Sequence, residues 1–173
     1  MHNGQKITPC LWFDNQAEEA ARYYCSIFPN SRIGQISRYG KAGYEVHRRP
    51  EGSVMTVAFE LDGHPFTALN GGPEFKFNEA TSFQILCETQ SELDAYWQKL
   101  TVGGDPKSQQ CGWLKDKFGL SWQVVPKVLP ALISDPDTEK SGRVMEALLK
   151  MKKIDIDQLK HAYAGKSEYA TTR

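Results

Sequence analysis

The sequence has few of the features that most directly assign a function. It contains no apolar run near the roughly 20 residues that cross a bilayer, so we expect no membrane partner. Lys and Arg number 21, as do Asp and Glu, and the net charge is therefore zero. Nucleic-acid-binding domains usually carry a basic excess, so we expect no nucleic acid. Residues 1–6 lack the apolar core of a secretory signal, and we expect a cytoplasmic protein.

Local motifs for metal and cofactor chemistry are also missing. The four cysteines contain no C-x-x-C pair, which excludes zinc-ribbon and dithiol redox motifs. In a reducing compartment we expect them to be reduced, small core residues. The glycine pairs Gly71-Gly72 and Gly103-Gly104 lack the G-x-G-x-x-G spacing of nucleotide-binding folds. No G-x-S-x-G nucleophile elbow is present either.

The strongest positive feature is an internal repeat. A strand-like run over 7–13 precedes an amphipathic, helix-like segment over 16–28, for which Asp14 or Asn15 could be the N-cap. The same order returns 74 residues later in 82–88 and 91–100. This repeat predicts a duplicated module, and chance similarity between two amphipathic strand–helix units is the alternative.

Strand-like runs follow each predicted helix. In the first half they are 31–39, 53–61 and 64–70, and in the second half 109–115 and 120–125. Asp62-Gly63 and residues 116–119 predict hairpin turns between them. Residues 40–52 are expected to form a polar loop. We therefore predict module one over 5–72 and module two over 80–126.

A helical tail is predicted over 127–165. Asp135 is the expected N-cap of its first helix, with Pro136 at the first helical position. Three apolar residues of this helix share one face, and we expect that face to cover a partner subunit: Val144, Leu148 and Met151.

Three strings in the sequence resemble one known family. They are the Trp-Phe-Asp, Ala-Glu-Glu-Ala and Tyr-Tyr runs within 12–24, the segment 111–126, and the segment 143–155. Together they are similar to the PhnB-like group labelled 3-demethylubiquinone-9 3-methyltransferase, in the vicinal-oxygen-chelate superfamily. The resemblance implies an α+β fold of duplicated βαβββ modules that form a glyoxalase-like cup, with a C-terminal helical extension. It also implies a homodimer, since such cups are completed by modules that pair within or between chains.

The resemblance also says where a metal would bind. In metal-dependent relatives His, Gln or Glu from the first and last strands of each module hold a divalent ion. Here those positions carry Thr8 to Cys10, Ser82 to Gln84, Asn70 and Gln123. None is a histidine or a carboxylate, the ligands that such ions prefer, so we expect no metal and no cofactor. His64 is the one histidine considered, and a structural turn residue is its favoured interpretation.

The remaining hypothesis is a pocket for a small organic molecule. Such pockets combine apolar walls with a few polar groups, and the candidate ligand-binding residues are Thr8, Trp12, Asn70, Gln84, Trp122 and Gln123. The alternative for Trp12 and Trp122 is plain core packing. We therefore predict a small-molecule-binding protein without metal catalysis. Two alternatives stay open: an enzyme (a metal-dependent lyase or isomerase, or the methyltransferase of the family label), and an interaction module whose cup is filled by side chains.

Overall fold

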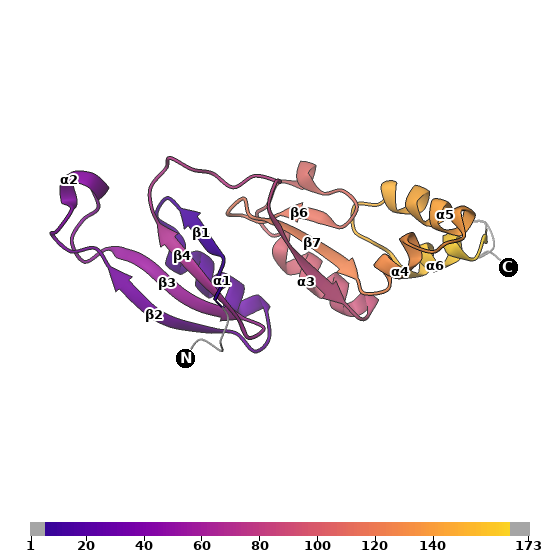
Figure 1. Cartoon of the computed structure of the whole chain (residues 1–173), viewed down its shortest axis with the longest axis horizontal. Helices are drawn as coiled ribbons and strands as arrows, with labels where there is room; N and C mark the ends of the chain where they lie inside the picture. Colours follow the sequence, from indigo (N-terminus) through magenta and orange to yellow (C-terminus); the bar gives the residue numbers. More distant parts are fainter. Residues whose placement is uncertain (1–5, 167–173) are drawn as a thin grey trace. The chain divides into compact units, whose positions relative to one another are not determined.

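The computed structural model describes residues 6–166, which divide into two compact units with the sequence boundary between Phe77 and Asn78 (Figure 1). The predicted module one lies in the first unit, although its first residue, Gln5, is outside the described residues. The predicted module two and the tail both belong to the second unit. The prediction that all of them make a single domain stays a prediction.

The first unit is a four-stranded sheet with one long helix. Its elements in chain order are β1 (Cys10–Phe13), α1 (Ala17–Ile27), β2 (Arg32–Arg38), α2 (Tyr44–His47), β3 (Val54–Leu61) and β4 (His64–Asn70). The strand order is β1-β4-β3-β2, with β1 parallel to β4 and the other pairs antiparallel. This is the predicted βαβββ order, with the short α2 added inside the expected loop.

The core of the first unit lies between α1 and one face of this sheet. Small residues at helical spacing, Ala17, Ala20 and Ala21, are fully buried and let α1 approach the strands closely. Tyr24 then stacks on Phe59 of β3, with ring centroids 6.4 Å apart. Directly after β3, Asp62-Gly63 takes φ values of 46° and 75°. These left-handed angles confirm the predicted hairpin turn.

The second unit contains a smaller sheet. Its elements are β5 (Ser82–Cys87), α3 (Gln90–Leu100), the 3₁₀ turn η1 (Pro106–Ser108), β6 (Trp113–Lys115) and β7 (Ser121–Pro126). The order is β5-β7-β6, with β5 parallel and β6 antiparallel to β7. This unit thus has one strand fewer than the first. Glycine and proline explain the difference, because Gly103, Gly104 and Pro106 interrupt the segment where the further strand would run.

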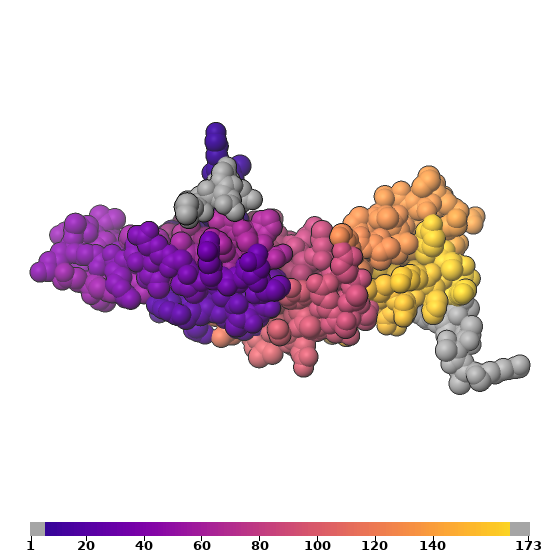
Figure 2. Space-filling view, turned by 90° about the horizontal axis from the view of Figure 1, so that it is seen from below, coloured from indigo at the N-terminus to yellow at the C-terminus, as the bar shows by residue number. Residues whose placement is uncertain are grey.

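The tail forms three helices: α4 (Leu129–Ile133), α5 (Thr138–Leu149) and α6 (Ile156–Tyr163). The predicted N-cap of α5 was wrong by two residues. Asp137 accepts hydrogen bonds from the backbone N–H groups of Glu139 and Lys140, so the helix begins after it. Asp135 instead accepts from the backbone N–H of Asp137 (2.8 Å), which fixes the turn before the helix. Figure 2 shows the orange and yellow surfaces of the tail in direct contact.

The apolar face of α5 does not need a partner subunit. Val144, Leu148 and Met151 are all buried within the second unit of a single chain, so the expectation that they cover a partner was wrong. Helix α5 packs along α6 and also contacts α4. Among the described residues no helix has the length and apolar character to span a membrane.

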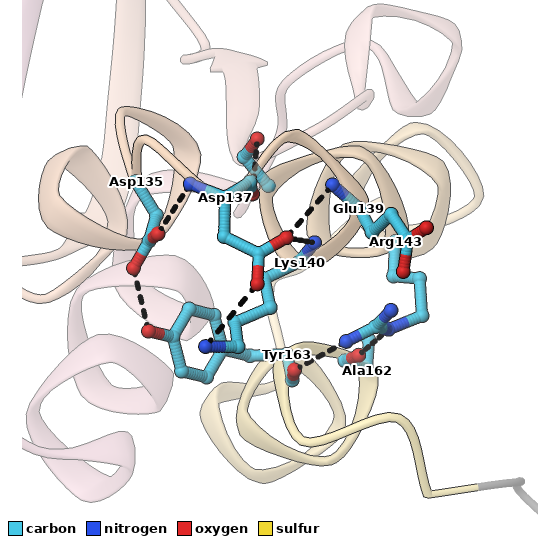
Figure 3. Close-up of polar contacts among 8 residues, drawn as sticks. Asp135, Asp137, Glu139, Lys140, Arg143, Ala162 and Tyr163 are labelled. Atoms are coloured by element: carbon cyan, nitrogen blue, oxygen red, sulfur yellow. Dashed lines mark hydrogen bonds and ion pairs between the residues drawn. The ribbon is translucent and has the colours of Figure 1, made fainter.

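Side-chain hydrogen bonds connect α5 and the turn before it to the C-terminal end of α6 (Figure 3). Arg143 donates two hydrogen bonds to the carbonyls of Ala162 and Tyr163, both at 2.9 Å. These carbonyls lie at the C-terminal end of α6, where the helix has no further N–H groups to offer. The hydroxyl of Tyr163 donates to Asp135 (2.6 Å). That bond lowers the pKa of Asp135 and raises the pKa of Tyr163.

The segment between α5 and α6 docks on the second sheet. The backbone N–H groups of Cys111 and Gly112 donate to Met151 and Lys152, each at 2.8 Å. The Gln90 side chain donates to the carbonyl of Ile154 (3.1 Å) and accepts from the N–H of Ile156 (2.9 Å). Ile154 is fully buried between these contacts. Gln90, the first residue of α3, thus holds the backbone at the start of α6 in place.

Candidate functional site

Each sheet has one face covered by a helix. In the second unit Cys87 of β5 is fully buried beside α3, whereas Gln84 and Leu86 on the other face are exposed. The register aligns six residues of that second face in two rows across the three strands. One row is Gln84, Gln123 and Trp113; the other is Ser82, Ser121 and Lys115. We call these six residues the glutamine face.

Hydrogen bonds connect the polar side chains of the glutamine face. The Nε2 of Gln84 donates to the Oε1 of Gln123 (3.2 Å), and the Nε2 of Gln123 donates to the Oγ of Ser82 (2.8 Å). A primary amide has two N–H donors and a hydroxyl both donates and accepts. Each group therefore keeps hydrogen-bonding capacity beyond this chain of contacts, which is what an oxygen-bearing ligand needs.

The one charged member of the glutamine face is Lys115. Its ammonium group forms an ion pair with Glu79, and this hydrogen bond lowers the pKa of the Glu79 carboxyl. The Lys115 side chain is 25% exposed and that of Glu79 is 64% exposed. The glutamine face thus combines neutral amides and hydroxyls with a single cation.

The corresponding face of the first sheet carries Cys10 and Trp12. Cys10 of β1 lies opposite Thr67 of β4, as Gln84 lies opposite Gln123 in the second unit. In the first unit Thr67 therefore holds the position that Gln123 holds in the second. Thr67 was not among the predicted site residues. Because the second unit has one strand fewer, the residue offset that aligns the first strands of the two units does not align their last strands. The repeat alone therefore could not predict that Thr67 corresponds to Gln123.

Trp12 is held against the end of β4. Its indole N–H donates to the carbonyl of Gly72 (2.9 Å), and its ring lies so close to Gly71 that a Cβ there would collide with it. Phe75 packs edge-on against the same ring, with centroids 5.0 Å apart, and is itself 65% exposed. Thr8 lies just before β1 and is half-buried. These contacts fix the Trp12 ring and leave an exposed aromatic group beside it.

Asn70 and Trp122 lie on the helix-covered faces of their sheets. Asn70 is 6% exposed; its Oδ1 accepts from the N–H of Ala17 (2.8 Å), and its Nδ2 donates to Val54 (3.0 Å). This side chain serves the start of α1, whose N-cap is Gln16 and not Asp14 or Asn15. Trp122 is 3% exposed and donates to Asp116 (2.8 Å). Of the six predicted ligand residues, Gln84 and Gln123 are joined to each other by a hydrogen bond.

Three of the thiol groups, those of Cys10, Cys25 and Cys87, have a raised pKa, which favours the protonated form. Burial raises the pKa of Cys87 to about 12, with a smaller contribution from Glu92. Partial desolvation also raises the pKa of Cys10 and of Cys25. Thiolate is the reactive form, so these residues are poor nucleophiles at neutral pH. The expectation that the cysteines are core residues was wrong for Cys10, which is exposed.

Metal-binding groups do not gather in the described part of the chain. Within residues 6–166 no three His, Cys, Asp or Glu side chains lie together in a way that could hold an ion. His64 is exposed and opens β4, where it pairs with Leu61 beside the hairpin turn.

The two sheets, each with a helix on one face and with parallel pairing of its first and last strands, confirm the predicted α+β fold. The chain belongs to the family described as 3-demethylubiquinone-9 3-methyltransferase, whose model matches residues 5–125. The resemblance to its PhnB-like branch is confirmed. The match ends before segment 143–155, the third string that suggested it.

The chain is similar to several solved structures. A PhnB protein from Bacillus cereus is 39% identical with a TM-score of 0.58, over 69% of this chain and 97% of that one. Protein PA1353 from Pseudomonas aeruginosa is 17% identical with a TM-score of 0.52, over 69% and 95%, which is a likeness of fold alone. The fosfomycin resistance protein FosX from Listeria monocytogenes is 13% identical with a TM-score of 0.42, over 70% and 91%. A comparison with curated proteins finds no match.

Proposed function

We propose that this protein binds a small organic molecule through the glutamine face and does so without a catalytic metal. The observation that carries the proposal is the hydrogen-bonded pair of Gln84 and Gln123, on the face of the second sheet that α3 leaves uncovered. The half-buried ring of Trp113 in the same row adds apolar area. A few polar groups beside an aromatic side chain are typical of small-molecule sites.

The donor set favours an organic ligand over a metal ion. Gln84 and Gln123 offer neutral amides at the register positions where the family resemblance implies metal ligands. Hard cations prefer carboxylates, and borderline cations prefer imidazole or thiolate. Amides suit carbonyl and hydroxyl groups of a ligand, since they donate and accept at once. Thr8 and Trp12 of the first unit remain proposed ligand residues. Asn70 and Trp122 could act only indirectly, through the strands that they stabilise.

A thermal-shift screen of a broad small-molecule library tests the proposal. A specific ligand raises the melting temperature in a concentration-dependent way. We expect Gln84→Ala and Gln123→Ala to weaken the binding of that ligand about tenfold or more, since each variant loses a hydrogen bond to it. Gln98→Ala, on the exposed side of α3, is the matched control and should bind normally. A screen without a stabilising ligand, or a ligand indifferent to both variants, would contradict the proposal.

The second candidate function is an enzyme, and the family's description as a methyltransferase is the observation that favours it. Calorimetry with S-adenosylmethionine tests this version, and saturable binding would replace our proposal. A metal-dependent lyase or isomerase is tested by elemental analysis of protein purified without chelators. A stoichiometric divalent ion would overturn the argument from the amide donors.

We also propose a cytoplasmic homodimer. Strands β1 and β5 stand at the edges of their sheets, where they are available for pairing with another module. The third hypothesis, an interaction module with a filled cup, predicts a partner and no small ligand. Sedimentation velocity measures the mass of the assembly, and a monomer at micromolar concentration would contradict the homodimer.

A further inference from the structure

The glutamine face contains a buried hydroxyl group that lacks a hydrogen bond. The Oγ of Ser121 is the only buried side-chain nitrogen or oxygen of the described residues without a partner. Ser121 is 1% exposed and stands in the middle of its row, between Ser82 and Lys115. Burying a hydroxyl without a partner costs free energy, so native proteins rarely keep one unless water or a ligand completes the bond. This atom therefore marks a position where a bound group belongs.

The neighbours of Ser121 define the chemistry of that group. Lys115, its partner on β6, supplies an ammonium group. Ser82, its partner on β5, accepts a hydrogen bond from Gln123 and keeps its own hydroxyl hydrogen to donate. A cation beside two hydroxyl donors matches an oxyanion, because charge-assisted hydrogen bonds are the strongest that such donors make.

An internal carboxylate already occupies part of this arrangement. Glu79 pairs with Lys115, and its side chain is largely exposed. Because the Glu79 side of this ion pair is exposed to solvent, the pair contributes modestly to stability, and a ligand can displace Glu79 at a small cost. Glu79 thus shows that the Lys115 ammonium group binds a carboxylate, and its own carboxylate competes with any negatively charged ligand.

We propose that Ser82, Ser121 and Lys115 form an oxyanion subsite, which takes a carboxylate or phosphate group of a small organic ligand. Glu79 is the carboxylate that such a ligand displaces. The inference rests on the proposed function and adds to it the class of ligand, small organic anions. It depends on the row of Ser121, whereas the proposed function depends on the row of Gln84 and Gln123.

Titration with inorganic phosphate and, separately, with acetate tests the subsite. Binding is followed by amide NMR shifts at constant ionic strength, against chloride. We expect saturable shifts at residues 82, 115 and 121 with at least one of the two anions, and the stronger one identifies the group. Ser121→Ala and Lys115→Met should each weaken binding tenfold or more. Ser121→Ala removes only an unpartnered hydroxyl, so it should fold, and its spectrum verifies this.

Glu79→Gln is the sharper variant because it removes the competing carboxylate. We expect it to strengthen anion binding up to about fivefold, the change that corresponds to the loss of a partly exposed ion pair. Lys107→Met and Ser26→Ala, both at exposed positions, are the matched controls and should leave binding unchanged. Equal weakening by Lys107→Met and Lys115→Met would mean general charge attraction and would overturn the subsite.

Two further outcomes would also overturn the oxyanion subsite, and they distinguish its failure from a failure of the proposed function. Absence of saturable binding by both anions would leave a buried water as the partner of Ser121. A ligand from the screen that needs Gln84 and Gln123 but binds Ser121→Ala normally would leave the proposed function intact and remove the subsite.

Discussion

At the scale of single residues, Asn70 shows how a polar side chain at the end of a strand can stabilise the fold. Its amide joins three elements, since it accepts from Ala17 of α1, donates to Val54 of β3 and itself ends β4. We expect Asn70→Ala to reduce the free energy of unfolding by about 2–4 kcal/mol, because two backbone groups lose their partner. Urea unfolding measures the change. Asn78→Ala, at an exposed position, is the control. An effect below about 1 kcal/mol would show that these two hydrogen bonds contribute little to the stability of the fold.

The buried thiol of Cys87 gives a prediction about pH. Its pKa in the folded chain is about 12, whereas the pKa of an unfolded cysteine is about 8.5. The folded state therefore retains a proton that the unfolded state loses. The contribution of Cys87 to stability is complete below about pH 8 and declines as the pH rises toward the folded pKa.

Between about pH 9 and 11 we expect the wild-type protein to lose about 1 kcal/mol per pH unit relative to Cys87→Ala. Urea unfolding of both proteins at several pH values measures this difference, and titration of lysines and tyrosines cancels in the comparison. Parallel pH profiles of the two proteins would mean that Cys87 ionises in the folded state.

At the scale of elements, the turn at Cys111-Gly112 is where the tail docks on the second sheet. Gly112 has a φ of 84°, and a Cβ there would lie 2.8 Å from the Cδ1 of Ile154 and 2.9 Å from the carbonyl oxygen of Val124. Gly112→Ala should therefore cost about 3 kcal/mol, from backbone strain and overpacking together. Gly119→Ala is the matched control, because it has the same φ but open space around its Cβ.

Gly119→Ala should cost only about 1–2 kcal/mol, the strain of a left-handed alanine. Chemical unfolding measures both variants, and limited proteolysis reports whether the segment 150–155 has detached in Gly112→Ala. Equal costs for the two substitutions would show that the contact with Ile154 does not limit the fold.

Local patterns in the sequence predicted most elements but not the faces on which their residues lie. The alternation of apolar residues and the Asp62-Gly63 turn placed β3 and β4 within one residue of their observed bounds. The side of the sheet to which Asn70 points depends on its pairing with Phe13, a partner far away in the sequence. The glutamine pair was accessible from sequence because the repeat aligned Gln84 with the first strand. Ser121 was not, since a buried hydroxyl lacks any local signal.

At the scale of the whole molecule, the tail distinguishes this chain from its relative in Bacillus cereus. The alignment uses 97% of that chain and only 69% of this one, and the family match ends at residue 125. The relative therefore has little sequence to supply a tail of this length. In this chain the tail supplies carbonyl acceptors for hydrogen bonds from Gln90, Cys111 and Gly112 of the module.

A chain that ends at Lys127 tests whether the tail is a stabiliser or part of the site. We expect it to fold with a melting temperature lower by about 10 °C or more, since the Cys111 and Gly112 N–H groups lose their acceptors and the surface beneath Ile154 becomes exposed. The glutamine face should keep its ligand affinity, because its described hydrogen bonds lie within residues 79–123. Thermal unfolding and ligand titration of the truncated chain measure the two properties separately. Lost affinity in a folded truncated chain would place the tail in the binding site, whereas an unchanged melting temperature would refute its stabilising role.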